Sequence, residues 1–355
     1  MSNLGRKPES FEMFVSYTSK DEERYLELQK AIRNLTRSNT VIVRDINSVE
    51  PGEESETTIH QYIQKVNIAL LLFSPDFIDS EQCYKHLQKL ISQHQEEKAW
   101  LVPIILRTSD WENTLSNIDI DNSKFKILPS NRIPIAKWEH QDDAFDDIRK
   151  NLEEIIKSLR EEQYKQIEED YKLDINSYQK ELITKPNDYM LWNNLASSLQ
   201  KLGDLQKSNS HNNAMSSYEE ALLAYQKFIE LQPSSYVALS KQGLLLEKLD
   251  KPEAAADSYE RGLAIKPDNQ ILLSRSSAVQ EKFGKYGVAI TLYDKILEKD
   301  QSNYEIWTRR GEALRKSRRF KEAIESFNQS LVIQPNYRAA KYYQRKTYRE
   351  IMQST

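Results

Sequence analysis

The sequence predicts an α/β domain followed by an all-α domain: a doubly wound, five-stranded parallel sheet of the flavodoxin-like kind, then a solenoid of helix pairs. Two observations predict this. In the first half, short apolar runs alternate with amphipathic stretches of helical period, which is typical of a parallel sheet whose strands are buried on both faces. In the second half, a pattern recurs with a regular period of about 34 residues, which is typical of stacked helix pairs.

The five expected strands are short, and the middle ones are apolar throughout. Between them lie segments with apolar residues three and four apart, the spacing of one helix face. Strand and helix in alternation favour parallel strands joined by helical crossovers. The strands are expected at Phe11–Tyr17, Thr40–Ile46, Asn67–Phe73, Trp100–Leu106 and Ile133–Trp138, and the helices at Asp21–Leu35, Glu56–Val66, Gln82–Gln95 and Ala144–Leu159.

Proline, small and aromatic residues carry the period of the second half. The interval from Pro233 to Pro267 is one period, and Pro335 lies two further periods along the chain. Alanine recurs with the same interval at 255, 289 and 323, and an aromatic residue at 259, 293 and 327. A small residue lets two helices approach, and a large ring fills the space beside it. Each unit is therefore expected to be a helix pair that stacks on its neighbours.

One further unit begins near Tyr189. Pro186 and Pro233 lie further apart than one period, so this unit holds additional residues, and the polar stretch 205–217 is expected to form them as a loop between its helices. The predicted organisation is an α/β domain at 11–159, a connector at 160–188 built as a degenerate helix pair, a solenoid of four repeats at 189–337, and a capping helix at 338–355.

Composition excludes several classes of function. The 355 residues carry a formal charge of −4, so no overall basic field attracts nucleic acid or an anionic membrane. The basic run 307–321 is accompanied by glutamates, which favours a solvated or protein-contact face. One cysteine excludes a disulfide framework, and His60, His86 and His94 do not have metal-ligand spacing. Without a signal peptide or membrane span, we expect a cytoplasmic protein that has no metal site and binds neither nucleic acid nor membrane.

Several ordered motifs of the first half match one family. They are FVSYTSKDE at Phe14–Glu22, Asp45 with ProGlyGlu at Pro51–Glu53, LLLFSPDFIDSEQC at Leu70–Cys83, and VPIILR at Val102–Arg107. On these residues, 11–159 resemble a TIR domain of the kind common in bacterial multidomain proteins. Residues 189–337 are similar to tetratricopeptide repeats, because their period is about 34 residues.

The resemblance to TIR domains leaves two kinds of function open. Some TIR domains assemble with other TIR domains to pass a signal, and others cleave NAD at the nicotinamide–ribose bond. The cleaving kind is implied to need a glutamate three residues after a Cys or similar small residue, in the helix after the third strand. A fixed carboxylate there stabilises the positive charge that develops on the ribose.

In this sequence His86 stands at the glutamate position, three residues after Cys83. A neutral imidazole supplies no negative charge, and a protonated one opposes the developing cation. Three interpretations stay open: a surface residue in a domain without catalysis, a general acid or base in altered chemistry, or a different alignment of the motif. Cys83 is expected to be a buried small residue rather than a nucleophile.

Ligand contacts, if NAD binds, are expected from Tyr17, Arg44, Gly52 and Cys83, because ligands gather at the carboxyl ends of parallel strands. The resemblance also gives Pro51 and Gly52 a part in TIR–TIR contacts. An ordinary turn is the alternative for this Pro-Gly pair. No cofactor is required, and NAD is a substrate only in the enzymatic interpretation.

The repeats are expected to offer a groove lined by the first helix of each pair. Lys248, Lys282 and Lys316 recur with the period of the repeats, and Lys201 is their equivalent in the interrupted repeat. This ladder would suit an acidic peptide; the alternative is a set of ordinary solvated lysines, because lysine is common at this place in such repeats. The carboxylate clamp for chaperone tails is not expected, because it needs an asparagine where this chain has Ser197, Leu244, Ala278 and Glu312.

The sequence therefore predicts a signalling or adaptor protein. Its TIR domain would self-associate or recruit another TIR protein, and its repeats would bind an unknown protein or peptide. Bacterial immunity is a setting that the resemblance alone implies. The alternative is an NAD glycohydrolase regulated by the repeats.

Overall fold

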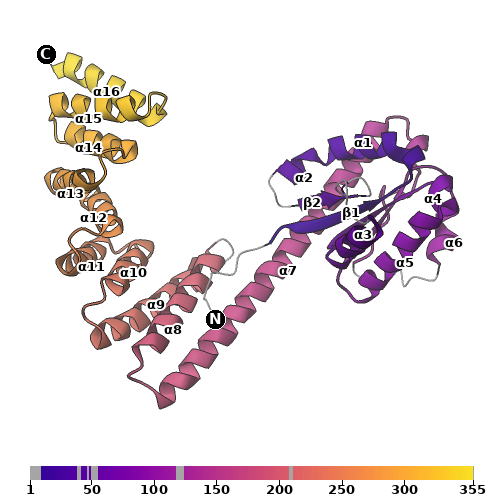
Figure 1. The fold of residues 1–355 in the computed structure, drawn as a ribbon, viewed down its shortest axis with the longest axis horizontal. Helices are drawn as coiled ribbons and strands as arrows, with labels where there is room; N and C mark the ends of the chain where they lie inside the picture. The colour runs from indigo at the N-terminus through magenta and orange to yellow at the C-terminus, as the bar shows by residue number, and fades with distance from the viewer. Residues whose placement is uncertain are drawn as a thin grey trace. The chain divides into compact units, whose positions relative to one another are not determined.

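A computed structural model describes residues 9–37, 41–45, 48, 55–116, 124–207 and 211–354. The chain divides into two compact units, Met1–Gln166 and Ile167–Thr355, and each is treated by itself. Figure 1 gives the labels of the helices and strands used below. The first unit is an α/β fold, and the second is built from helices.

A parallel sheet lies at the centre of the first unit. Its strand order is β2-β1-β3-β4, and Met13 of β1 pairs with Val43 of β2 on one side and Ile68 of β3 on the other. All six residues of β3 are buried, as an apolar strand covered on both faces requires. The strands are β1 Phe11–Ser16, β2 Val41–Arg44, β3 Ile68–Phe73 and β4 Trp100–Ile105.

Helices cover both faces of this sheet. Leu70 and Leu72 of β3 belong to one buried cluster with residues of α1 and α7. Ala69 and Leu71 belong to a second cluster with residues of α3, α4 and α5. The alternation follows from the strand period of two. The helices are α1 Glu22–Ala31, α2 Arg33–Arg37, α3 Ser55–Gln64, α4 Pro75–Asp79, α5 Glu81–Gln95, α6 Trp111–Leu115 and α7 Gln141–Thr184.

The fifth strand expected at 133–138 is not formed. Residues Ile135–Lys137 make a 3-10 turn instead, and Pro134 beside it has no N–H to donate to a ladder. An upstream segment lies along β4, where Phe125 and Leu128 form isolated parallel bridges with Leu101 and Ile104. Short bridges of this kind complete the edge of the sheet without a regular strand.

The connector expected as a helix pair at 160–188 is also different. Its residues as far as Thr184 continue α7 as one helix. Ile148 and Leu152 of α7 are buried with the sheet. Further along, Tyr171 and Ile175 are buried in a cluster with residues of the second unit. Apolar residues three and four apart continue along the whole segment, and this favours an unbroken helix.

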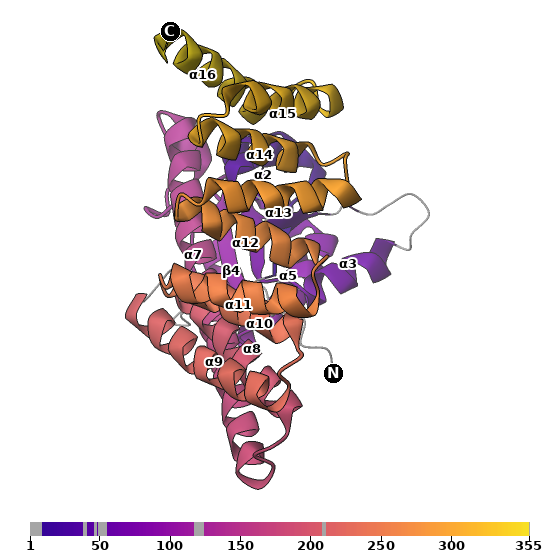
Figure 2. The same ribbon diagram turned by 90° about the vertical axis from the view of Figure 1, so that its left-hand side faces the viewer.

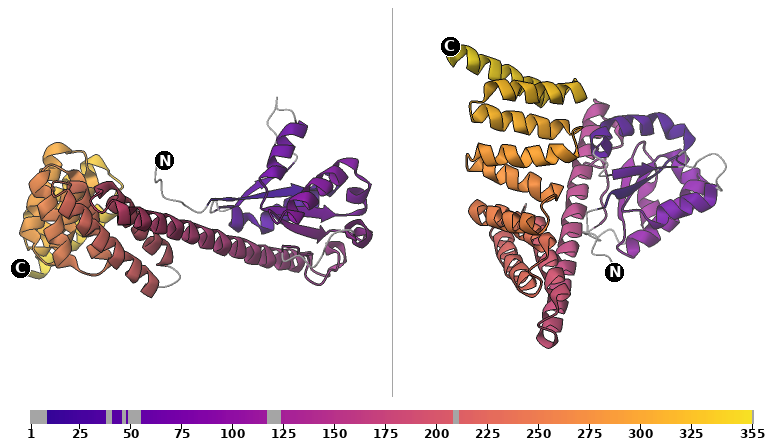
Figure 3. Two further views of the ribbon diagram at one scale, coloured as in Figure 1. Left: turned by 90° about the horizontal axis from the view of Figure 1, so that it is seen from below. Right: turned by 60° about the vertical axis from the view of Figure 1, so that its left-hand side comes forward.

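The second unit is a stack of helix pairs followed by one helix (Figures 2 and 3). Helices of a pair pack on each other, and each second helix packs on the first helix of the next pair. The last helix, α16, packs on α15, as a cap does. The bounds are α8 Tyr189–Gln206, α9 His211–Leu231, α10 Tyr236–Lys248, α11 Pro252–Ile265, α12 Gln270–Lys282, α13 Tyr286–Lys299, α14 Tyr304–Lys316, α15 Phe320–Ile333 and α16 Arg338–Ser354.

A glycine opposite an aromatic ring sets the distance between the helices of a pair. A Cβ added at Gly243 would lie 2.4 Å from the ring of Tyr259, and one at Gly311 would lie 2.6 Å from the ring of Phe327. Both rings are completely buried. Only glycine permits this approach.

The additional residues of the first pair do not form a simple loop. Helix α8 has 18 residues where α10 has 13, and α9 has 21 where α11 has 14. Gly203 contacts the ring of Tyr218 as Gly243 contacts Tyr259. The contact between Gly203 and Tyr218 holds the extended ends of α8 and α9 together. Most of the polar insertion therefore lengthens these two helices.

Candidate functional site

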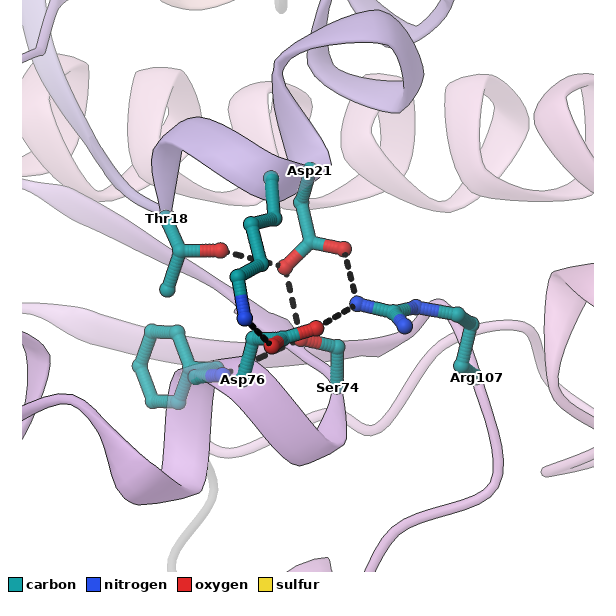
Figure 4. A network of polar contacts seen from close by, with 7 residues as sticks. Thr18, Asp21, Ser74, Asp76 and Arg107 are labelled. Atoms are coloured by element: carbon teal, nitrogen blue, oxygen red, sulfur yellow. Dashed lines mark hydrogen bonds and ion pairs between the residues drawn. The ribbon is translucent and has the colours of Figure 1, made fainter.

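Polar side chains gather where three parallel strands end, the edge at which α/β folds place ligands. Asp21 follows β1, Ser74 and Asp76 follow β3, and Arg107 follows β4. Figure 4 shows the four side chains converging, with Thr18 beside them. Strands distant in sequence are thus joined at this edge by one polar network.

Asp21 is the centre of the network and is 2% exposed. One carboxylate oxygen accepts hydrogen bonds from Thr18 Oγ1 at 2.8 Å and Ser74 Oγ at 2.6 Å. The other accepts from Arg107 Nη2 at 2.8 Å. A buried carboxylate is stable only with such a set of donors, so these contacts fix the loop after β1 against the ends of β3 and β4.

Asp76 extends the network toward solvent. It accepts from Arg107 at 2.5 Å and from Lys20 at 2.6 Å. The hydrogen bonds from Lys20 and Arg107 lower the pKa of the Asp76 carboxyl, and its own bond raises the pKa of the Arg107 guanidinium. Every carboxylate oxygen in the network has a donor, so the cluster holds the edge together.

His86 lies on α5, beside the end of β1, and it is buried. Its side chain is 6% exposed, so a surface position was the wrong expectation. Nδ1 lies 3.2 Å from Ser16 Oγ at the end of β1, and the ring meets Phe14 edge to face. Burial, with a smaller contribution from the charge of Lys89, lowers the pKa of His86 from 6.5 to about 4. At neutral pH the imidazole is therefore uncharged.

Cys83 packs beside this histidine. It is 3% exposed and its Sγ lies 3.6 Å from the carbonyl oxygen of Tyr17, which confirms the expected buried small residue. Burial raises the pKa of its thiol, so the thiolate needed for nucleophilic chemistry is disfavoured.

A cavity of about 360 Å³ opens beside His86, between α3 and α5. Glu56, Glu81, Lys85 and Lys89 also line it. Glu81 pairs with Lys85 at 2.9 Å, and the Glu81 side chain is 85% exposed. The cavity therefore has carboxylates at its rim and a neutral imidazole in its wall.

The other expected NAD contacts are engaged within the protein. Tyr17 is 3% exposed and stacks on Tyr25 with the ring centroids 4.2 Å apart. Arg44 lies 3.6 Å from Glu12 and over the ring of Tyr62. Each of these two side chains therefore has contacts within the first unit. Pro51 and Gly52 lie outside the described residues.

The expected lysine ladder is partly used inside the solenoid. Lys248 pairs with Asp204 and lies over the ring of Tyr218. Lys316 lies 3.3 Å from Glu312 and 3.7 Å from Glu281 of the preceding repeat. Lys201 is half-buried and Lys282 is exposed. These lysines do not form a uniform row, and two of them join neighbouring repeats.

A second cavity, of about 490 Å³, lies among the first helices of three successive pairs, α10, α12 and α14. Its wall combines Arg275 and Arg309 with Glu247 and Glu305, so it presents both signs of charge. Its position on the first helices agrees with the groove predicted from the sequence.

Sequence reasoning missed both the polar network and the burial of His86. Two signals were present. Asp21, Ser74 and Arg107 each follow a predicted strand, and the carboxyl ends of parallel strands meet at one edge. The spacing of Cys83, His86 and Leu90 along α5 also places the histidine on the helix face that carries apolar residues.

Within the described ranges, no cluster of three or more His, Cys, Asp or Glu side chains is arranged to hold a metal ion. Among the helices of the described chain, none combines the length and apolar character that a membrane crossing requires.

Comparisons with known proteins match a family model to part of each unit. A family model described as TIR domain matches residues 13–161, and one described as tetratricopeptide repeat matches 214–270 and 279–343. An uncharacterized protein of Sinorhizobium fredii, y4lF, is 31% identical over 143 residues, which are 40% of this chain. The match spans only 42% of the length of that relative.

Solved structures resemble the helical unit. The crystal structure of MamA protein is 22% identical with a TM-score of 0.39, over 48% of this chain and 86% of MamA. The first TPR of Spaghetti (RPAP3), bound to an HSP90 peptide, is 23% identical with a TM-score of 0.31, over 33% of this chain and 93% of that one.

Proposed function

Because the chain carries a TIR domain followed by tetratricopeptide repeats, we propose that it is a signalling or adaptor protein that acts by assembly. The TIR domain associates with further copies or with other TIR proteins, and the repeats dock a partner protein. Bacterial immunity is the setting proposed for this activity. Both parts of the proposal follow from domain types that work through protein contacts.

The buried, neutral His86 is the observation that carries this proposal. Cleavage of the nicotinamide–ribose bond leaves positive charge on the sugar, and a fixed carboxylate stabilises it. At the place where the resemblance puts that carboxylate, the chain has an imidazole held against Ser16 at 3.2 Å. An uncharged ring gives no such stabilisation, which supports assembly over catalysis.

The cavity beside His86 supports one alternative, an NAD glycohydrolase regulated by the repeats. Glu56 and Glu81 are the carboxylates that line this cavity together with His86. In this alternative one of them takes over the stabilisation of the ribose cation.

The test measures nicotinamide release from NAD by the full chain, across protein concentrations that permit assembly. The His86→Glu variant places a carboxylate at the altered position. Gln88→Glu is its matched control, because it adds the same charge at an exposed position on the same helix. Light scattering of the same samples measures the assembly.

We expect no release from the native chain and a mass that increases with concentration. Activity in His86→Glu but not in Gln88→Glu would identify a pocket that has lost its catalytic group, and it would leave the assembly proposal intact. Release by the native chain would overturn the proposal in favour of the enzyme. A silent chain that stays monomeric at every concentration would overturn the assembly part.

A further inference from the structure

Helix α16 presents a face made of cations and aromatic rings. Arg338, Lys341, Arg345 and Arg349 are spaced three and four residues apart, so they form one stripe along the helix. All four are exposed, as is Lys346. No aspartate or glutamate interrupts the stripe.

These five cations have no ion pair among the residues that the structure describes. The one described side-chain hydrogen bond from the set joins Lys341 to the amide oxygen of Asn336, at 3.4 Å. The acid of the helix, Glu350, binds Arg315 of α14 at 2.7 Å instead. The face therefore carries an uncompensated charge of five.

The basic run at 307–321, which the sequence analysis examined, is different. Arg310 pairs with Asp294 at 2.6 Å, Arg315 with Glu350 and Arg319 with Glu322. These three cations have carboxylate partners. The cations of α16 differ from them in forming one exposed stripe without such partners in the described structure.

The rest of the helix is already packed. Ala340 and Thr347 are completely buried, and the ring of Tyr343 stacks on Phe327 of α15 at 6.3 Å. The charged face is thus fixed in place by the opposite side of α16, at the end of the stack (Figure 2). A docking surface on a rigid element costs little ordering entropy on binding.

The uncharged residues on this face indicate the kind of partner. Tyr342 is 60% exposed, Tyr348 is 46% exposed and Met352 is 77% exposed. Tyrosine, methionine and arginine are the residues enriched at protein–protein contacts. A lipid-binding helix would need a broad apolar face, and that side of α16 is occupied by the solenoid.

We propose that this face of α16 is a docking surface for an acidic segment of a partner protein. The proposal rests on the docking role proposed for the repeats and names the chemistry of the partner. Carboxylates three and four residues apart on a partner helix would match the cation stripe in spacing, and the exposed tyrosines would pack beside them.

The test uses the full chain and a fluorescent, alanine-based peptide with glutamates at i, i+3, i+7 and i+11. Binding is followed by fluorescence anisotropy at low and high salt. The variant Arg345→Glu with Arg349→Glu reverses the centre of the stripe, and Arg345→Lys with Arg349→Lys keeps its charge. The control, Lys251→Glu with Lys295→Glu, makes the same net change at exposed positions, one just before α11 and one on α13.

We expect at least a tenfold loss of peptide binding in the reversed variant, and near-native binding in the lysine variant and the control. Binding should weaken as salt increases. Circular dichroism verifies that each variant keeps its helices.

An equal loss in the control variant would overturn the proposal, and so would no peptide binding by the native chain. Two further probes distinguish other anionic partners. A single-stranded oligonucleotide of mixed sequence, or vesicles containing phosphatidylserine, would overturn the proposal if it bound this face more tightly than the peptide. Failure here leaves the nicotinamide and light-scattering results unchanged, so the two proposals can fail separately.

Discussion

Nδ1 of His86 lies 3.2 Å from the hydroxyl of Ser16, and both side chains are buried. The contact joins helix α5 to the end of strand β1, where the resemblance to TIR domains implies a catalytic carboxylate. At this position the side chain is therefore part of the packing between α5 and β1. This has consequences for stability that can be measured.

Stability of the first unit should decrease in mild acid because of His86. Its pKa is 6.5 in an unfolded chain and about 4 in the fold, so between these values the unfolded chain binds more protons. The stabilisation is complete above pH 6.5 and is lost as the pH falls toward 4, by at most about 3 kcal/mol. Urea unfolding at pH 7.5 and 5.0 measures this dependence.

The variant His86→Asn should lose most of this pH dependence. His60→Asn is the matched control, because it makes the same substitution at an exposed position on α3. An equal pH dependence in native chain and His86→Asn would contradict the assignment.

Asp21→Asn should destabilise the edge of the sheet by about 2 kcal/mol, since a buried carboxylate with three donors is replaced by an amide that cannot accept from all of them. The value is below that of a fully buried ion pair, because the Arg107 side chain is 40% exposed. Urea unfolding and hydrogen exchange of the β1 and β3 amides report the loss. Asp76→Asn, at the solvent side of the network, should cost less; the reverse order would refute the central role of Asp21.

Gly243→Ala should destabilise the solenoid by about 2–3 kcal/mol, because overpacking a fixed core has this cost. The added Cβ would lie 2.4 Å from the buried ring of Tyr259. Gly287→Ala is the control: its Cβ would meet nothing within 4 Å, and the change should stabilise helix α13 by up to about 1 kcal/mol. Thermal unfolding of both variants tests the contrast in sign, and a native-like Gly243→Ala would be evidence against the close approach.

Four strands and the helix pairs could be predicted because their signals are local. A wholly apolar run such as Ile68–Phe73 and a regular repeat of proline, alanine and aromatic residues need no tertiary information. The apolar run at 133–138 misled, because Pro134 removes a ladder donor from it. The polar insertion near 205–217 was predicted to be a loop, but most of it is helical. Gly203 and Tyr218 make the same glycine–ring contact as the other helix pairs, and this contact was not recognised in the sequence.

The candidate site could be predicted only in part, because it depends on contacts between distant segments. The place of His86 in the sequence motif could be read directly, but its burial follows from the packing of α5 against β1. Asp21 and Arg107 are 86 residues apart and meet at 2.8 Å, a contact that requires the order of the strands. The cations of α16 could be seen in the sequence. That they have no ion pair among the described residues could not be predicted, because it depends on where Glu350 and the acids of other helices lie.

Tyrosine hydroxyls and acids occur together along the solenoid. Tyr259 donates to Glu247 at 2.5 Å and Tyr293 to Glu281 at 2.6 Å. In the next repeat, the position equivalent to Glu281 is Arg315 and the position equivalent to Tyr293 is Phe327. The acid and the hydroxyl are thus replaced together in that repeat. Tyr225 of the first pair, one period before Tyr259, keeps a buried hydroxyl that has no hydrogen-bond partner in the described structure, so the Tyr–Glu pair is a feature of two repeats.

Tyr293→Phe should therefore destabilise the solenoid by about 1–2 kcal/mol, the usual contribution of a hydrogen bond to a charged group. In this variant Glu281 keeps its ion pair with Lys316 at 3.7 Å. The other carboxylate oxygen of Glu281, which accepts from Tyr293, would lose its donor, and the Glu281 side chain is only 16% exposed. In a double-mutant cycle with Glu281→Gln, the two changes should be non-additive by about 1 kcal/mol. Tyr348→Phe, on an exposed ring, serves as the control and should leave urea unfolding unchanged. Additive effects, or a Tyr293→Phe variant as stable as the native chain, would show that the hydroxyls are incidental to the repeat.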